Sequence, residues 1–133
     1  MAKLLLVAAG ALIDRDGRVL LARRRRKGAM GGLWEFPGGK IGPDETPEEA
    51  LVRELDEELA IKTEESCLSP IAFSSMNSGE FHLLMPLFAC RKWKGTPQAI
   101  EHEALSWVKR EELMRYEMPP ADRPLAAQLR DFL

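Results

Sequence analysis

The 133-residue sequence predicts a mixed α/β (α+β) fold, and three observations support this class. Apolar, strand-like runs bounded by turn residues recur along the chain. Two other segments, 47–59 and 123–133, carry apolar residues at helical spacing. Hydrophobic residues make up 45% of the chain, which is enough for a substantial core, and no repeat or linker separates a second domain. We therefore expect residues 1–133 to form a single domain.

The composition favours a cytoplasmic protein that does not span a membrane. The formal net charge is −2, and the chain has no run of 18 apolar residues. The apolar start, Met1–Ile13, is similar to a signal peptide, but only Lys3 precedes the apolar run and a turn follows it, which favours a buried strand. Cys67 and Cys90 lack metal-binding spacing and fit reduced, buried residues.

Five strands are expected from the apolar runs: Lys3–Ile13, Arg18–Arg24, Ile71–Met76, Phe81–Arg91 and Ala104–Val108. The first two are joined by a hairpin turn at Asp16-Gly17, and the next two by a turn at 77–80. Pro86 has no N–H to donate, so we expect its strand to lie at a sheet edge or to be bulged there. Lys109–Tyr116 is expected to form a short helix.

The helix expected at Pro47–Leu59 carries the main functional signal. Thr46 is a favourable N-cap, Pro47 suits the first helical position, and Glu49 completes a capping box. Three carboxylates share one face of this helix at spacing i, i+3, i+4: Glu54, Glu57 and Glu58. Like charges at this spacing destabilise a helix, so their clustering indicates a bound hard cation. A solvated acidic face is the common alternative.

The spacing around this helix resembles the Nudix box of the Nudix hydrolases. Five residues separate Gly39 from Glu45, seven more precede Arg53, and the chain continues Arg-Glu-Leu-Asp-Glu-Glu-Leu-Ala-Ile to position 61. Ala60 stands where the family pattern has glycine, at a cost of up to ~1 kcal/mol if its backbone is left-handed. Three flanking segments resemble the MutT branch: 33–40, 101–107 and 119–124. The resemblance implies the Nudix fold, a mixed β-sheet sandwiched between α-helices.

The resemblance also implies metal-dependent chemistry. Hydrolysis of a diphosphate bond needs relief of phosphate charge and a deprotonated water, and Mg²⁺ (or Mn²⁺ in its place) supplies both. The implied metal ligands are Glu57, Glu58 and the carbonyl of Gly39 or Gly38, with Glu54 as a ligand or as the group that orients water. Arg53 would orient a glutamate. Glu101 is a metal ligand or general base, with a register uncertain by two positions because His102 and Glu103 follow it. The choice of base between Glu54 and Glu101 stays open.

Four residues are implied as substrate contacts: Arg24, Phe36, Lys40 and Asp122. The MutT branch uses the position of Asp122 to hydrogen-bond the base, often with Asn. An ionised Asp accepts only, which suits donors on cytosine or oxidised guanine, whereas a protonated Asp also donates. Each residue has a structural alternative: Asp122 as a helix N-cap, Phe36 in the core, and Lys40 as an exposed loop lysine.

The expected function is a nucleoside triphosphate pyrophosphohydrolase that cleanses the nucleotide pool of 8-oxo-dGTP. A preference for CTP or dCTP is the alternative, because Asp122-Arg123-Pro124 after Pro-Pro-Ala resembles cytidine-triphosphate pyrophosphohydrolases related to MutT. A non-catalytic binding module or an RNA-processing enzyme using the basic run 23–27 is less favoured. We expect a small nucleotide as substrate, no stable nucleic-acid partner, no membrane partner, and a monomer or small homo-oligomer.

Overall fold

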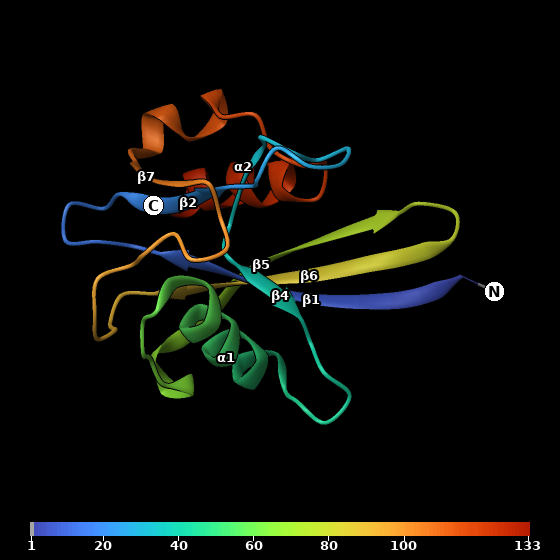
Figure 1. Ribbon diagram of the computed structural model, residues 1–133, viewed down its shortest axis with the longest axis horizontal. Coiled ribbons are helices and arrows are strands. Elements are labelled where there is room, and N and C mark those ends of the chain that lie inside the picture. Colours follow the sequence, from blue (N-terminus) through green and yellow to red (C-terminus); the bar gives the residue numbers. More distant parts are fainter. Residues whose placement is uncertain (1) are drawn as a thin grey trace.

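The computed structural model describes residues 2–133 (Figure 1). Helix α1 spans Pro47–Leu59 and α2 spans Asp122–Phe132, and two short 3₁₀ turns lie at Glu65–Cys67 (η1) and Arg110–Arg115 (η2). The strands are β1 (Lys3–Leu12), β2 (Val19–Arg23), β3 (Trp34–Glu35), β4 (Gly38–Lys40), β5 (Leu68–Asn77), β6 (Phe81–Cys90) and β7 (Ala104–Val108). The helix expected at Pro47–Leu59 and the strand expected at Ala104–Val108 are therefore confirmed, and the segment 109–116 contains a 3₁₀ turn.

The strands form two sheets. One is mixed, in the order β4-β1-β6-β5, with β1 parallel to β6 and the other pairs antiparallel. The second is antiparallel, in the order β3-β2-β7. The turn predicted at Asp16-Gly17 is present, with Gly17 at φ 78° and one bridge from Ile13 to Val19. The expected hairpin ends there, because β1 then pairs with β6 and β4 while β2 pairs with β7 and β3.

Strand β1 separates two apolar cores. Successive side chains of a strand point to opposite faces. Ala8 and Leu12 accordingly pack in the core that contains the apolar face of α1, whereas Ala9 and Ala11 pack in the core that contains α2. In Figure 1 the mixed sheet runs through the middle of the molecule, with α1 on one side and α2 on the other. The expected sandwich of a mixed sheet between helices is confirmed.

Two expectations about individual residues are corrected. Pro86 lies in β6, an interior strand of the mixed sheet, so the predicted alternative of an edge position is wrong. The other alternative, a bulge at Pro86, is wrong as well, because β6 keeps the same register with β1 on both sides of it. Its missing N–H coincides with an interruption of the β1–β6 ladder, which pairs Leu6 with Leu84 and resumes at Ala9 and Leu87. Cys90 is buried and free as expected, but the free Cys67 is only half-buried because it ends η1 at the surface.

Among residues 2–133, no helix combines the length and the apolar character needed to cross a membrane.

Candidate active site

Helix α1 is fixed at both ends by local contacts. The Thr46 hydroxyl accepts the N–H of Glu49 at 3.1 Å, and the Glu49 carboxylate accepts the N–H of Thr46 at 2.8 Å, which is the predicted capping box. At the other end Ala60 adopts the left-handed conformation, with φ 57° and ψ 36°. These two ends and the buried leucines of α1 fix the rotation of the helix, so its acidic face is turned toward the Gly38–Gly39 segment.

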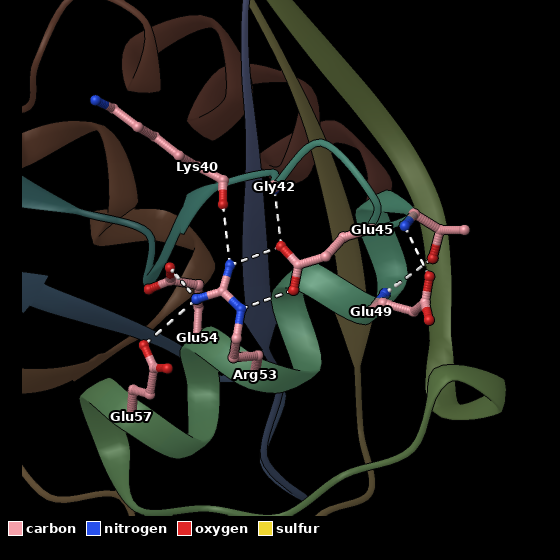
Figure 2. Close-up of polar contacts among 8 residues, drawn as sticks. Lys40, Gly42, Glu45, Glu49, Arg53, Glu54 and Glu57 are labelled. Carbon is pink, nitrogen blue, oxygen red and sulfur yellow. Dashed lines mark hydrogen bonds and ion pairs between the residues drawn. The ribbon is translucent and has the colours of Figure 1, made fainter.

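Arg53 is the hub of the acidic face (Figure 2). Its guanidinium donates to both carboxylate oxygens of Glu45, at 2.7 and 2.8 Å. It also donates to Glu54 at 2.8 Å, to Glu57 at 3.4 Å and to the carbonyl of Lys40 at 3.2 Å. The Arg53 hydrogen bonds, helped by the Gly42 N–H, lower the pKa of Glu45 to about 2. Arg53 thus orients the glutamates of α1 and ties the helix to the β4 loop.

Sequence reasoning assigned no role to Glu45. The structure makes it the anchor of Arg53, and its carboxylate also accepts the N–H of Gly42 at 2.8 Å. Its fixed distance in sequence from Gly39 and Arg53 was the available signal.

Glu58 occupies a different environment from Glu45. It is 8% exposed, and its Oε2 accepts the N–H of Gly38 at 3.2 Å. The pKa of Glu58 is raised to about 8, mainly by burial. The charges of Glu54, Glu101 and Glu35 contribute to this rise, and the Gly38 N–H opposes it. Burial also raises the pKa of Glu54, although Arg53 opposes this shift. Glu58 therefore lies within electrostatic range of three other acids.

The Gly38–Gly39 segment leaves room for these carboxylates because it lacks side chains. It forms β4 and pairs with Ala9 and Ala8 of β1. A Cβ atom on Gly39 would lie 2.4 Å from the carboxyl carbon of Glu54, and one on Gly38 would lie 2.0 Å from the Ala8 carbonyl oxygen. Both distances are far below van der Waals contact. The lack of a side chain at Gly38 allows β4 to approach β1, and the lack of one at Gly39 leaves space for the Glu54 carboxyl group.

The loop before β7 brings Glu101 to the same region. Arg25 donates to the carbonyl of Glu101 at 2.9 Å and to that of Ile100 at 3.3 Å, and the Ile100 N–H donates to the Glu58 carbonyl at 3.3 Å. The charge of Glu101 acts on both Glu54 and Glu58. The neighbouring acid, Glu103, lies instead 3.4 Å from Arg23 and 3.5 Å from Arg26. Of the two acids in this loop, Glu101 is thus the one associated with the α1 carboxylates.

Glu35 and His102 form a second polar cluster that sequence reasoning did not identify. His102 is 7% exposed, its Nε2 lies 2.9 Å from Glu35, and its Nδ1 has no hydrogen-bond partner within residues 2–133. Glu35 also accepts from Arg24 at 3.1 Å. A cavity of ≈300 Å³ joins this cluster to the α1 site and is lined by Arg24, Arg25, Lys27, Glu35, Glu58, Glu101 and His102. Glu35 lies inside the Trp-Glu-Phe-Pro-Gly-Gly segment, which was the available signal.

Asp122 does not cap α2, so its interpretation as an N-cap is wrong. It is the first residue of the helix, and its carboxylate accepts the N–H of Phe36 at 3.1 Å. Asp122 is 5% exposed, and burial raises its pKa to about 7, with the Phe36 N–H opposing the shift. The charge of Glu35 adds to the rise and that of Arg24 opposes it. Asp122 is therefore electrostatically linked to the cluster that lines the cavity.

The other two expected substrate contacts, Phe36 and Lys40, do not line this cavity. Phe36 is 4% exposed and packs in the core that contains α2, which supports its structural alternative. Lys40 is exposed, and in Figure 2 its side chain points away from the glutamates. Only its carbonyl takes part in the site, as an acceptor for Arg53.

The residues present fit a divalent cation. Carboxylate and carbonyl oxygens are the ligands that hard cations prefer, and Gly39 provides the cradle that a Cβ would fill. Within the described chain, however, no three acid, histidine or cysteine side chains already converge as a ligand set. Figure 2 shows that Arg53 bonds to two of the candidate ligands, Glu54 and Glu57. Arg53 engages one oxygen of each carboxylate, so the other oxygen is left for a cation.

Comparison with known proteins identifies the family. The NUDIX domain model matches residues 8–128. The CTP pyrophosphohydrolase of Escherichia coli K12 is 42% identical over 116 residues, which cover 86% of this chain and 84% of that protein. The 8-oxo-dGTP diphosphatase of the same strain is 32% identical over 133 residues, or 96% of this chain and 98% of that one. The chain belongs to the Nudix family of hydrolases, as its sequence pattern predicted.

A solved structure agrees with this assignment over nearly the whole chain. The solution structure of the E. coli ORF135 protein superposes with a TM-score of 0.87 at 37% identity, covering 98% of this chain and 91% of that one. A MutT Nudix hydrolase from Burkholderia pseudomallei gives a TM-score of 0.83 at 29% identity, with coverage of 96% and 98%.

Proposed function

We propose that this protein is a Mg²⁺-dependent nucleoside triphosphate pyrophosphohydrolase that releases a nucleoside monophosphate and pyrophosphate. The observation that carries the proposal is the association of Glu54, Glu58 and Glu101 beside the Gly38–Gly39 segment. Mutual repulsion and burial make such a group of acids costly, and a divalent cation would offset that cost. The names of the similar E. coli enzymes support a nucleoside triphosphate as the substrate class.

Glu57, Glu58 and the Gly39 carbonyl are the proposed cation ligands, with Glu54 as a further ligand. The bound cation would neutralise phosphate charge and acidify a water molecule. Arg53 keeps Glu54 and Glu57 on one side of the helix through its anchor on Glu45. The positive side chains that line the adjoining cavity, Arg24, Arg25 and Lys27, are suited to attract the polyphosphate.

Glu54 and Glu101 are the two candidates for the general base. Arg53 already engages one oxygen of the Glu54 carboxylate at 2.8 Å, so this group is held on the guanidinium and is less free to approach a water molecule. The Glu101 carboxylate takes part in no ion pair within residues 2–133, while Arg25 fixes its main chain. We therefore assign the base to Glu101 and the orienting or ligating role to Glu54.

Asp122 is the proposed contact to the base of the nucleotide. One of its carboxyl oxygens is occupied by the Phe36 N–H, which fixes the plane of the group. With a pKa of about 7, the side chain is present both as an acceptor and as a donor near neutral pH. An ionised Asp122 suits a ring N–H of oxidised guanine, and a protonated one also suits the adjacent donor and acceptor of cytosine.

Oxidised dGTP is our first candidate substrate, and the proposed role is sanitation of the nucleotide pool. A cytidine triphosphate is the second candidate, favoured by the 42% identity to a CTP pyrophosphohydrolase and by the aspartate at position 122.

The decisive experiment is a nucleotide panel with Mg²⁺ that includes 8-oxo-dGTP, dGTP, CTP, dCTP and a nucleotide sugar. Products are separated by anion-exchange chromatography, and kcat/KM is determined for each substrate. Monophosphate and pyrophosphate are the expected products. Release of orthophosphate, or activity confined to nucleotide sugars, would contradict the proposal. A Glu101→Gln variant tests the base, because full retention of kcat would transfer that role to Glu54.

A further inference from the structure

A basic segment with a central tryptophan follows β6 and lies outside the candidate active site. Residues 91–94 read Arg-Lys-Trp-Lys. Two cavities meet at Lys92 and Trp93. One, of ≈410 Å³, is also lined by Lys62, Thr63, Glu64, Cys67 and Lys94, and the other, of ≈600 Å³, by Ile13, Asp14, Arg15 and Arg91. Neither shares a lining residue with the cavity that contains Glu58.

These cavities gather cations in a chain whose net charge is −2. Five exposed basic side chains line them: Arg15, Lys62, Arg91, Lys92 and Lys94. Only two acids do so, Asp14 and Glu64, and Asp14 is already paired with Arg18 at 2.8 Å. Lys62 bonds to Asp56 at 2.7 Å, whereas the other four cations take part in no ion pair within residues 2–133. The surface is therefore suited to an anion.

Trp93 provides a rigid aromatic surface between the two cavities. Its ring is half-buried and stacks on Trp107 of β7, with ring centroids 6.1 Å apart and planes inclined by 15°. Trp107 in turn packs against the core that contains α1. The support of Trp107 restricts the motion of the Trp93 ring, so a ligand that stacks there loses little of its binding energy to ordering the side chain.

We propose that Trp93 and the surrounding cations form a second, non-catalytic site for a nucleobase that carries phosphates. Stacking of a base on an aromatic ring, combined with cations along the phosphates, is the general mode by which proteins hold unpaired nucleotides. The ligand is either a free nucleotide or a nucleotide unit of a single strand, since both present the same chemistry. This inference does not depend on the proposed catalytic activity.

The three segments that form the site lie together at one end of the molecule. The β1–β2 turn, the connection after α1 and the segment after β6 are all found in Figure 1 at the end opposite the N label. Lys3, the first residue of β1, is an exposed lysine that lines neither cavity and is therefore suited to a matched control.

The test is a ¹H–¹⁵N titration of the three tryptophan indole N–H signals in EDTA, which prevents metal-dependent hydrolysis. The probes are a single-stranded thymidine octanucleotide with a 5′-hydroxyl, dTTP, and inorganic tripolyphosphate. The Trp93 signal, assigned from Trp93→Phe, is expected to shift with at least one nucleotide probe. A response to the octanucleotide alone identifies a strand as ligand, and a response to dTTP alone identifies a free nucleotide. Shifts confined to Trp34, or equal affinity for tripolyphosphate, would overturn the proposal.

Two variants separate the base from the phosphates. Lys92→Glu is expected to weaken binding by about tenfold or more, while Lys3→Glu, with the same charge change, leaves it unaltered. Trp93→Leu preserves an apolar contact to Trp107 and is expected to weaken binding by about 5- to 150-fold. Unchanged affinity in Lys92→Glu would refute the site even if Trp93→Leu failed to fold.

Discussion

The ionisation of Asp122 gives the sharpest test of the geometry. This carboxyl is 5% exposed, has Phe36 as its single donor among residues 2–133, and lies near the charge of Glu35. Asp122→Asn keeps the shape of the side chain and an oxygen that accepts the Phe36 N–H, but it removes the ability to ionise. We expect the variant to be more stable than the parent protein at alkaline pH, because the buried charge is eliminated.

The magnitude follows from the two pKa values. The folded-state pKa of Asp122 is raised to about 7 from an ordinary 3.8, so the unfolded chain loses this proton first as the pH rises. The contribution of Asp122 to the free energy of unfolding therefore falls by about 1.4 kcal/mol per pH unit between these two pKa values and is constant above the folded-state pKa. The advantage of the Asn variant is about 1.5 kcal/mol at pH 5 and about 4 kcal/mol at pH 9, a gain of about 2.5 kcal/mol.

Urea unfolding in EDTA at pH 5 and pH 9 measures this gain. Comparing the same pair of proteins at two pH values cancels any pH-independent effect of the amide, and other titrating groups are common to both. The gain corresponds to a midpoint shift of about 1 M urea. Asp131→Asn is the matched control, since Asp131 is an exposed aspartate near the other end of α2. Its effect is expected to stay within about 0.5 kcal/mol at both pH values.

An Asp122→Asn effect that is equal at pH 5 and pH 9 would refute the reasoning. It would mean that Asp122 ionises at its ordinary pKa in the folded protein. Near neutral pH, Asp122 would then be an acceptor only, and its burial would not affect which nucleobase it can bind.

The remaining predictions concern catalysis and α1. Glu57→Gln is expected to lower Mg²⁺-dependent kcat by about 100-fold or more with an unchanged circular dichroism spectrum. The control variant Glu48→Gln, in the first turn of the same helix, is expected to retain the kcat of the parent protein. If Glu57→Gln also retained the parent kcat, Glu57 would not belong to the metal site. Arg25→Lys keeps the charge but loses the paired contacts to the Glu101 loop, so kcat is expected to fall about 10- to 100-fold with a smaller change in KM. The control variant Arg26→Lys is not expected to show this loss. A change confined to KM in Arg25→Lys would assign Arg25 to substrate binding. Ala60→Gly is expected to raise the free energy of unfolding, measured in urea, by about 0.5–1 kcal/mol, because Ala60 has a positive φ. A lower free energy of unfolding in this variant would show that the left-handed alanine is unstrained.

Features set by neighbours in sequence were predictable. The limits of α1 depend on Thr46, Glu49 and Ala60, all within three residues of a helix end, and each behaves as its residue type dictates. The β5–β6 pair was likewise predictable, because the short connection at 77–80 leaves few alternatives to an antiparallel hairpin. The 3.6-residue period of the helix was sufficient to put the three glutamates on one face.

Features set by distant contacts were not predictable. The N–H of Phe36 and the carboxylate of Asp122 are 86 positions apart, and Arg25 is 76 positions from the Glu101 carbonyl that it binds. The same applies to β1 and β2, which a hairpin turn joins but which belong to different sheets. For Asp122 and for the first two strands, an apparent local role, as helix cap or as hairpin, was overridden by a tertiary partner that no local pattern reveals.

Glu45 and Glu58 lie in the same region of the molecule but differ in the environment of their carboxylates. Glu45 lies in the loop before α1 and accepts the N–H of Gly42, whereas Glu58 lies on α1 and accepts the N–H of Gly38. Two Arg53 donors and a backbone N–H stabilise the charge on Glu45 and lower its pKa to about 2, so it stays ionised and anchors Arg53 at any physiological pH. Glu58 has one backbone donor, is buried, and lies near other acids, so its pKa rises to about 8. Glu45 therefore needs no further cation to stay ionised, whereas a neighbouring cation would favour the ionisation of Glu58.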